Sequence, residues 1–326
     1  INTCLFGDCR DSLDKIKQAG ITVQACITSP PYYGLRSYLD DINPNKHLEV
    51  GLEETPEEYI QGLVEVFRKV RDVLADDGTL WVNIGDSYYN YRPGKSYTKQ
   101  TIASSNQDLP ENTAKRNKKL VGYKEKDLIG IPWMLAFALR NDGWYLRQDI
   151  IWAKGTSGLT REGNILPESV KDRCTKSHEY IFLLSKNKNY YFDYKAIQEP
   201  AKDWGTRDRS NFRNGTTDPK LKHHGLNTSP EMGNRRSVWR VNPKPYKGAH
   251  FATYPTELIQ PCIVASTRPN DIVLDPFLGS GTTALLSEQL GRKWIGCELN
   301  EDYRVLQDER LGNTILKKLL DKNSQV

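Results

Sequence analysis

The sequence predicts an α/β protein whose mostly parallel sheet is covered by helices on both faces. Short apolar runs that fit buried strands alternate with segments whose apolar residues recur at helical spacing. A proline-rich turn and a glycine-rich turn follow two of these runs, at the strand ends where parallel sheets bind ligands. With 326 residues, of which 37% are hydrophobic, the chain can bury the core of one large domain or two moderate ones.

The individual elements follow from local patterns. Thr55-Pro56-Glu57-Glu58 is a capping box with proline at the first helical position, and apolar residues then recur at helical spacing as far as Leu74. Further helices are expected at residues 132–140 and 283–290, and Asp77-Gly78 predicts a turn. Strands are predicted at residues 23–28, 79–84, 145–152, 179–184, 271–275 and 293–298.

Positive charge is concentrated in two polar segments. Residues 88–126 hold nine basic and three acidic side chains, and residues 201–250 hold eleven basic and four acidic ones. The net charge of the whole chain is only +5, so the rest of the protein is acidic. Aromatic residues are interleaved with the basic ones in both segments. This distribution favours contact with a polyanion over the alternative of two solvated loops.

The composition argues against several classes of protein. No window approaches the ~18 consecutive apolar residues of a membrane span, and the first residues show no signal peptide, so a cytoplasmic protein without membrane contact is expected. The six cysteines lie mostly in apolar stretches and predict reduced thiols rather than a disulfide framework. The five histidines lack ligand spacing, so no metal site is expected.

A glycine turn at residues 275–283 follows one predicted strand. Its glycines let a ligand approach the backbone, and the free amides at the start of the next helix favour a carboxylate or phosphate. Glu298 ends the following strand, nineteen residues after Gly279, where an acid can accept both hydroxyls of a ribose. The turn also satisfies the dinucleotide fingerprint, which leaves a nucleotide-dependent oxidoreductase as an alternative, although only 28 residues follow Glu298.

A proline turn, Thr28-Ser29-Pro30-Pro31-Tyr32-Tyr33-Gly34, follows the first predicted strand. The prolines stiffen this turn and have no N–H of their own. The Ser29 hydroxyl and the Pro30 carbonyl can accept the two hydrogens of an exocyclic amine, and Tyr32 offers a ring for stacking. The pattern therefore predicts a site for a planar heterocycle that carries an amine.

Together these two turns resemble the motifs of the S-adenosylmethionine-dependent DNA amino-methyltransferases, [D/N/S]-P-P-[Y/F/W] and D-P-F-x-G-x-G-T-T. The target-amine motif precedes the cofactor motif with a long basic segment between them, which resembles the beta class of that family. The resemblance covers most of the chain in the family's order and includes Ser177-His178-Glu179-Tyr180. It implies the class I methyltransferase (Rossmann-like) fold, a seven-stranded sheet with one antiparallel strand, and it adds Thr3 to Phe6 to that sheet.

The resemblance also divides the chain. Residues 1–87, 128–194 and 249–326 are expected to form the catalytic domain, with the target-amine motif in the first part and the cofactor site in the last. Residues 88–127 would be a basic insertion that contacts DNA, and residues 195–248 an inserted target-recognition region.

The cofactor implied by the resemblance is S-adenosyl-L-methionine. Its ribose is expected on Glu298, its adenine near Asp8 and Cys9, and its methionine part against the glycine turn, with His250 to Pro255 closing over the methionine end. The cofactor-binding residues are thus expected to be Asp8, Cys9, Asp275, Phe277, Gly279, Ser280, Gly281, Thr282, Thr283 and Glu298.

The implied partner is double-stranded DNA, bound by a monomer or homodimer, with a cognate restriction endonuclease of the same recognition site left open. Because the target amine lies inside the duplex, the base is expected to rotate out of the stack. Basic side chains would grip phosphates and read base edges. The residues expected to bind DNA are Arg207, Arg209, Arg213, Lys220, Lys222, Arg235, Arg236, Arg240, Lys115, Arg116, Lys118 and Lys119.

The expected catalytic residues are Ser29, Pro30, Pro31 and Tyr32. An aromatic amine is a poor nucleophile and a serine is no general base at neutral pH, so the turn is expected to hold the amine lone pair toward the sulfonium methyl for direct transfer. A cytosine C5 methylase would need a nucleophilic cysteine in a Pro-Cys-Gln context. Pro261-Cys262 is followed by Ile263 within a helical pattern, which argues against that chemistry.

The identity of the methylated base depends on Ser29. In the family, N6-adenine enzymes more often carry Asp or Asn at this position, and N4-cytosine enzymes usually carry Ser. A hydroxyl can also donate a hydrogen bond to the ring N3 of cytosine. The sequence therefore predicts N4-methylation of cytosine in a restriction-modification or protective setting, with N6-adenine methylation as the alternative. An RNA methylase and an inactive DNA-binding protein are further alternatives.

Overall fold

The structure is a computed structural model that describes residues 1–35, 37–89, 119–154, 170–201, 231–243 and 254–312. The described part contains an eight-stranded sheet, a two-stranded sheet, the α-helices α1 to α5 and a further helical stretch at residues 303–312. The strands are β1 (Thr3–Phe6), β2 (Val23–Thr28), β3 (Leu74–Ile84), β4 (Tyr145–Ala153), β5 (His178–Ser185), β6 (Glu199–Pro200), β7 (Met232–Gly233), β8 (Val238–Arg240), β9 (Ile272–Asp275) and β10 (Lys293–Glu298). The helices are α1 (Cys9–Gln18), α2 (Pro56–Val73), α3 (Ile131–Asn141), α4 (Thr256–Ser266) and α5 (Thr282–Gln289), with short 3-10 helices at Lys46–Leu48 and Lys195–Ile197.

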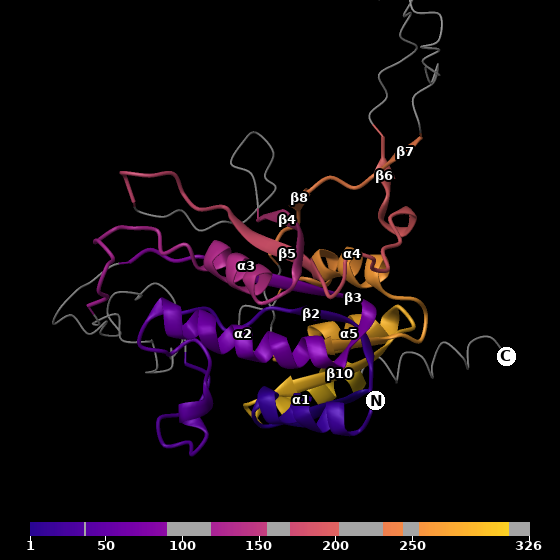
Figure 1. The fold of residues 1–326 in the computed structure, drawn as a ribbon, viewed down its shortest axis with the longest axis horizontal. Coiled ribbons are helices and arrows are strands. Elements are labelled where there is room, and N and C mark those ends of the chain that lie inside the picture. Colours follow the sequence, from indigo (N-terminus) through magenta and orange to yellow (C-terminus); the bar gives the residue numbers. More distant parts are fainter. Residues whose placement is uncertain (36, 90–118, 155–169, 202–230, 244–253, 313–326) are drawn as a thin grey trace, which may run out of the picture.

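The large sheet has the order β1-β10-β9-β2-β3-β5-β4-β8, and β5 alone among these strands runs antiparallel to its neighbours. This confirms the predicted parallel sheet with one antiparallel strand. The seven predicted strands are all present, including Thr3–Phe6, which pairs with β10. Strands from the two ends of the chain, indigo and yellow in Figure 1, are thus neighbours in the sheet.

The sheet has one strand more than predicted, because β8 pairs in parallel with β4 through Ile151 and Val238. This short strand comes from residues 195–248, the expected target-recognition region. It covers backbone groups of β4 that would otherwise be exposed at the sheet edge. Part of that region therefore belongs to the large sheet. Two other short strands of the region, β6 and β7, pair with each other in the small antiparallel sheet.

Helices cover both faces of the large sheet, as Figure 1 shows. Helices α1, α2 and α3 pack on one face, where Cys26 of β2 and Leu80 of β3 lie in the same apolar cluster. Helices α4 and α5 pack on the other face with Ala25, Ile27 and Trp81. Neighbouring residues of a strand point to opposite faces, so these continuous apolar runs supply both clusters.

Helix α2 begins at the predicted capping box, in which Thr55 and Glu58 bond each other's backbone N–H groups. The helix ends at Val73, and Leu74 already belongs to β3. The predicted turn at Asp77-Gly78 is a bulge within that strand, because Val23 pairs with Leu74 whereas Ala25 pairs with Thr79. A Cβ on Gly78 would lie 2.6 Å from the Leu74 side chain, so glycine provides the room that the bulge needs.

Helix α1 was missing from the sequence prediction. It has few apolar residues, but Leu13 and Ile16 are buried against the sheet and Asp8 caps its start by accepting from the Arg10 N–H. Cys9, Leu13 and Ile16 recur at helical spacing on one face, so this spacing and the Asp8 cap are local signals that could have predicted the helix. All six cysteines are free, as expected, and four of them are buried. Cys174 differs from the expectation of core thiols because it is exposed.

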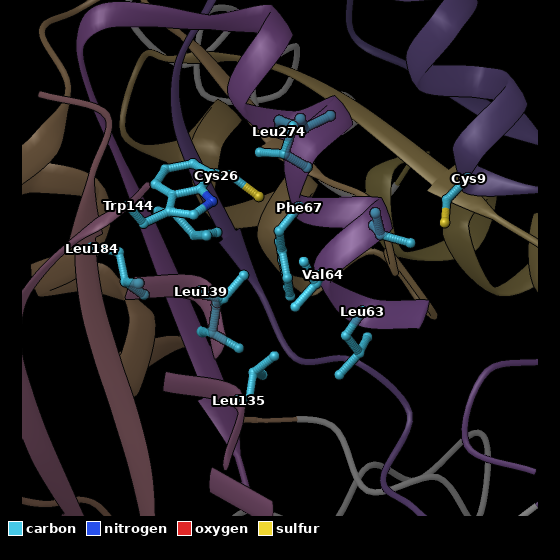
Figure 2. Close-up of a cluster of buried hydrophobic side chains, with 14 of the residues drawn as sticks. Cys9, Cys26, Leu63, Val64, Phe67, Leu135, Leu139, Trp144, Leu184 and Leu274 are labelled. Atoms are coloured by element: carbon cyan, nitrogen blue, oxygen red, sulfur yellow. The ribbon is translucent and has the colours of Figure 1, made fainter. Parts of the chain in front are cut away.

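The cluster beneath α2 is expected to dominate stability. Figure 2 shows Leu63, Val64 and Phe67 of this helix close to Cys26 and Leu274 of the sheet. Phe67 is fully buried, so Phe67→Ala should lower the free energy of unfolding by about 3–5 kcal/mol, because it removes apolar contacts and leaves a cavity. Urea unfolding monitored by circular dichroism measures the change.

Phe137 of α3 provides the matched control because its side chain is 44% exposed. Phe137→Ala should cost less than about 1 kcal/mol. Equal losses for the two variants would contradict the placement of the core.

Candidate functional site

The two predicted turns lie side by side because their strands are neighbours. Strands β2 and β9 pair in parallel, with Ala25 opposite Val273 and Cys26 opposite Leu274. Both strands therefore end at the same edge of the sheet, where one leads into the proline turn and the other into the glycine turn. The Thr28 hydroxyl donates a hydrogen bond of 2.6 Å to Oδ1 of Asp275 and ties the two strand ends together.

Asp275 is the polar centre of this edge. Its carboxylate accepts hydrogen bonds from the hydroxyls of Thr28, Thr283 and Tyr254 and from the Phe277 N–H. Burial raises the pKa of Asp275, while these four donors oppose the shift. Each of its two oxygens accepts two hydrogen bonds, so this side chain is suited to holding the turns in place rather than to contacting a ligand.

Tyr254 also explains the position of its segment. Its hydroxyl bonds Asp275 and Thr283, and burial raises its pKa well above the usual value. Tyr254 thus lies at the glycine turn, and the expected closure of the segment from His250 to Pro255 over the methionine end stays a prediction. Residues 250–253 are outside the described part.

The glycine turn provides backbone space and an unused hydroxyl. Gly279 and Gly281 have φ angles of +54° and +86°, in the region that favours glycine. A Cβ on Gly279 would meet no atom within 4 Å, so the backbone there faces open space. Ser280 is buried, and its Oγ has no hydrogen-bond partner within the described ranges. Thr282 and Thr283 begin helix α5 and are buried.

Glu298 ends β10 beside this turn. One carboxylate oxygen accepts the Gly279 N–H at 2.8 Å, and the other accepts the Asn300 N–H at 2.9 Å. Burial raises the pKa of Glu298 to about 7, although both backbone hydrogen bonds lower it. The side chain is therefore a buried acid that changes charge near neutral pH.

Asp8 and Cys9 shortly follow strand β1, whose last residue pairs with Glu298. Phe6 pairs with Glu298, and the Gly7 N–H donates to the Glu298 carbonyl at 2.8 Å. Asp8 forms a salt bridge with Arg10, and Cys9 is buried in α1. The structure thus brings the predicted cofactor residues from both ends of the chain to one edge of the sheet.

These residues fit S-adenosylmethionine by their chemistry. The buried Ser280 hydroxyl lacks a partner and can donate to a carboxylate, which the methionine part of the cofactor carries. Gly279 leaves space at the backbone, and Glu298 can accept from ribose hydroxyls when it is ionised.

In the proline turn, the carbonyl of Pro31 already accepts a hydrogen bond of 2.7 Å from the Tyr59 hydroxyl of α2. This bond anchors the turn to a fully buried side chain. The neighbouring Pro30 is buried, whereas Ser29 is only partly buried. Ser29 directly follows Thr28, which holds the strand end beside Asp275.

Tyr32 is fixed by residues that the sequence did not single out for a role. Its hydroxyl donates a 2.7 Å hydrogen bond to Oε2 of Glu179 and lies 3.3 Å from Oδ1 of Asn83. A Cβ on Gly85 would approach the Tyr32 ring to 2.6 Å. Lys154 at the end of β4 pairs with the other oxygen of Glu179. Burial and the Glu179 charge raise the pKa of Tyr32 well above its usual value.

The sequence signal for Glu179 was Ser177-His178-Glu179-Tyr180, which contributed to the resemblance without a function. Antiparallel β5 begins at His178, at the same edge where β3 and β4 end. Three strands and the proline turn thus meet around Tyr32. The topology needed to find this meeting point is not visible in any local pattern.

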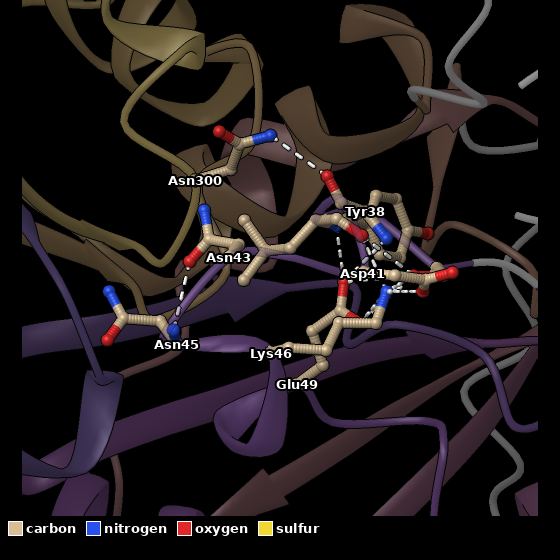
Figure 3. Close-up of polar contacts among 9 residues, drawn as sticks. Tyr38, Asp41, Asn43, Asn45, Lys46, Glu49 and Asn300 are labelled. Carbon is tan, nitrogen blue, oxygen red and sulfur yellow. Dashed lines mark hydrogen bonds and ion pairs between the residues drawn. The ribbon is translucent and has the colours of Figure 1, made fainter.

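A braced loop connects the proline turn to the cofactor edge. Glu49 accepts the backbone N–H groups of Tyr38 and Leu39 and pairs with Lys46. The Asn300 side chain donates to the Tyr38 carbonyl at 3.0 Å, as Figure 3 shows. The loop that follows Tyr32 and the residues that follow Glu298 are therefore in direct contact, through Tyr38 and Asn300.

The predicted DNA-binding residues fall into two groups. Arg236 pairs with Glu199, the Arg235 guanidinium lies over the Trp239 ring, and Arg240 and Lys119 are exposed. Arg235 and Trp239 therefore take part in packing around β8. The remaining predicted residues lie outside the described part: Arg207, Arg209, Arg213, Lys220, Lys222, Lys115, Arg116 and Lys118.

Two further structural observations concern the described residues. No group of three or more His, Cys, Asp or Glu side chains in these ranges is arranged to hold a metal ion. None of the helices described here has both the length and the apolar character that crossing a membrane requires.

Comparison with known proteins identifies the family. A family model described as DNA methylase matches residues 23–307. Type II methyltransferase M.Cfr9I of Citrobacter freundii is 43% identical over 314 residues, which cover 95% of this chain and 87% of that protein. Type II methyltransferase M.SmaI of Serratia marcescens is 43% identical over 311 residues, which cover 94% of this chain and 89% of the relative.

Solved structures share the fold. The PvuII DNA methyltransferase, described as cytosine-N4-specific, superposes with a TM-score of 0.57 at 17% identity and covers 94% of this chain and 85% of its own. The M1.HpyAVI–SAM complex superposes with a TM-score of 0.53 at 19% identity and covers 95% of this chain and 98% of that one. The chain therefore belongs to the DNA methylase family, the S-adenosylmethionine-dependent DNA amino-methyltransferases.

Proposed function

We propose that this enzyme transfers a methyl group from S-adenosylmethionine to the N4 amine of a cytosine rotated out of duplex DNA. The observation that carries the proposal is the hydrogen bond between Thr28 and Asp275. It holds the proline turn that bears Ser29 beside the glycine turn, so a target amine on one and a methyl donor on the other would be neighbours. Such positioning is the main requirement of a direct transfer between two bound molecules.

The cofactor would be held by residues of the glycine turn and the adjoining strands. The Ser280 hydroxyl would donate to the methionine carboxylate, and ionised Glu298 would accept from the ribose hydroxyls. Asp8 and Cys9 follow β1 next to Glu298 and would contact the adenine. When bound, the cofactor supplies an electrophilic methyl group on a positively charged sulfur.

The target amine would be held by Ser29 and the Pro30 carbonyl. Both accept hydrogen bonds, and together they would turn the amine lone pair out of the base plane toward the methyl donor. No nucleophilic side chain is needed, because the amine attacks the methyl carbon directly. The extra proton on the methylated amine would leave afterwards to solvent.

Ser29 favours cytosine as the target. A neutral hydroxyl can accept from the amine and donate to a ring nitrogen, whereas the Asp more common in N6-adenine enzymes only accepts when ionised. N6-adenine methylation is the competing proposal, since both pockets must hold an exocyclic amine.

The two basic segments support duplex DNA as the substrate. The exposed side chains of Arg240 and Lys119 would contact its phosphates. The names of the relatives, Type II methyltransferases, support a role in restriction-modification, with an endonuclease of the same recognition site as the functional partner.

Nucleoside mass spectrometry of DNA tests the target base. A methylase-deficient bacterial host expressing the protein should accumulate N4-methylcytosine, and sequencing of its methylome should place the modification in one recognition sequence. A host expressing the Ser29→Ala variant is the matched control. N6-methyladenine without N4-methylcytosine would refute the proposed target, and modification confined to RNA would refute the substrate.

Ser29→Ala should lower the rate of methyl transfer by roughly 100-fold, because the amine loses one of its two acceptors and its alignment. The dissociation constant for S-adenosylmethionine should change little, since Ser29 lies on the target side. Single-turnover transfer of labelled methyl and equilibrium binding of the cofactor measure the two effects separately. An equal collapse of cofactor binding would show that Ser29 does not belong to the target side.

Cofactor binding should weaken as the pH falls below about 7, because burial raises the pKa of Glu298 to about that value. The ionised carboxylate accepts hydrogen bonds from the ribose hydroxyls, so protonation of Glu298 removes the form of the enzyme that binds the cofactor. The dissociation constant for S-adenosylmethionine should therefore rise up to about tenfold per pH unit below the pKa. Calorimetric titration between pH 6 and 8 measures this, together with the accompanying proton release. Glu298→Gln should bind more weakly and lose the pH dependence; an unchanged dependence would assign the titration to another group.

A further inference from the structure

Tyr32 is constrained on two sides before any base is bound. Its hydroxyl donates to Oε2 of Glu179 at 2.7 Å and lies 3.3 Å from Asn83. One ring edge packs against the Gly85 backbone, where any larger residue would clash with it. A ring held at its hydroxyl and at its edge has few orientations available.

Glu179 is itself held in place by its neighbours. Lys154 pairs with Oε1, and the Asn83 amide donates to Oε2 at 3.3 Å. Asn83 also donates to the Tyr180 carbonyl at 3.1 Å, which fixes its amide on β3 beside β5. The Glu179 side chain is only 13% exposed and that of Lys154 27%, so water competes little with this pair.

We propose that Glu179 is a positioning residue for the target base, which orients the Tyr32 ring through the hydrogen bond to its hydroxyl. Lys154 and Asn83 hold the Glu179 carboxylate in that position. The inference rests on the proposed function, because Tyr32 is the ring on which the extruded base would stack. A preset ring lowers the entropy that the enzyme loses when it aligns the amine with the methyl donor.

The network also explains the use of tyrosine at this position. A phenylalanine would present the same face for stacking but would have no bond to Glu179. Phenylalanine would also leave the buried carboxylate with one donor fewer, which is costly in a site with little water. The tyrosine hydroxyl thus acts within the protein rather than on the substrate.

Single-turnover methyl transfer to plasmid DNA from a methylase-deficient host tests this role. Glu179→Ala should lower the rate constant on the order of 10- to 100-fold, because the ring and the base on it lose alignment. Glu179→Gln should recover most of the rate, since its amide oxygen still accepts from the Tyr32 hydroxyl. Cofactor affinity should be the same in all of these variants.

Tyr32→Phe removes the same hydrogen bond from the other side, and it should slow transfer about as much as Glu179→Ala. The double variant Tyr32→Phe/Glu179→Ala should be no slower than either single variant, because one interaction cannot be lost twice. Tyr190→Phe is the matched control. The Tyr190 hydroxyl accepts a hydrogen bond from Arg147 outside the network, so its loss should leave the rate unchanged.

Three outcomes would overturn the positioning role. A Glu179→Ala enzyme that transfers methyl as fast as the wild type would contradict this role directly. The rate losses of the two single variants could instead multiply in the double variant, or Glu179→Gln could be as slow as Glu179→Ala. Either result would mean that Glu179 acts by balancing the charge of Lys154. Methylation of an amine other than cytosine N4 would refute the proposed target base but would leave the comparison of these variants, and hence this role, intact.

Discussion

The hydrogen bond between Thr28 and Asp275 is the constraint on which the site depends. It joins the carboxyl ends of two neighbouring parallel strands, and each strand continues into one of the two functional turns. Asp275 accepts three further hydrogen bonds, so a single buried carboxylate fixes Thr28, Thr283, Tyr254 and the start of the glycine turn. Removing it would leave several buried donors without an acceptor, which explains why a costly buried acid is retained.

The enzyme separates its chemical tasks between rigid and adjustable groups. In the proposed mechanism, prolines, the Ser29 hydroxyl and a strand end would form the target side, where alignment of a weak nucleophile is the main requirement. The cofactor side contains Glu298, whose charge changes near neutral pH because burial raises its pKa. Between the two sides, the Tyr38–Asn300 contact joins the loop after the proline turn to the strand end that carries Glu298. Target and cofactor sites therefore share a braced framework.

The resemblance and the topology agree because both depend on strand order. A parallel sheet collects loops from distant parts of the chain at one edge, and in this protein residues 6–9, 28–32, 275–283 and 298–300 meet there. Strand β8 shows that the expected target-recognition region is not a separate appendage, since it pairs with β4. Lys154 directly follows the paired end of β4 and contacts Glu179, so this region adjoins the site through the sheet.

The sequence by itself determined six of the seven predicted strands, the capped helix α2, the two functional turns and the family, whose resemblance added Thr3 to Phe6. Each of the others leaves a local signal in apolar spacing, prolines, glycines or a motif. The tertiary structure alone decided the bulge in β3, the added strand β8 and the contact of Tyr32 with Glu179. These features join residues far apart in the chain, and their stability comes from packing and burial, which depend on neighbours that local sequence patterns do not reveal.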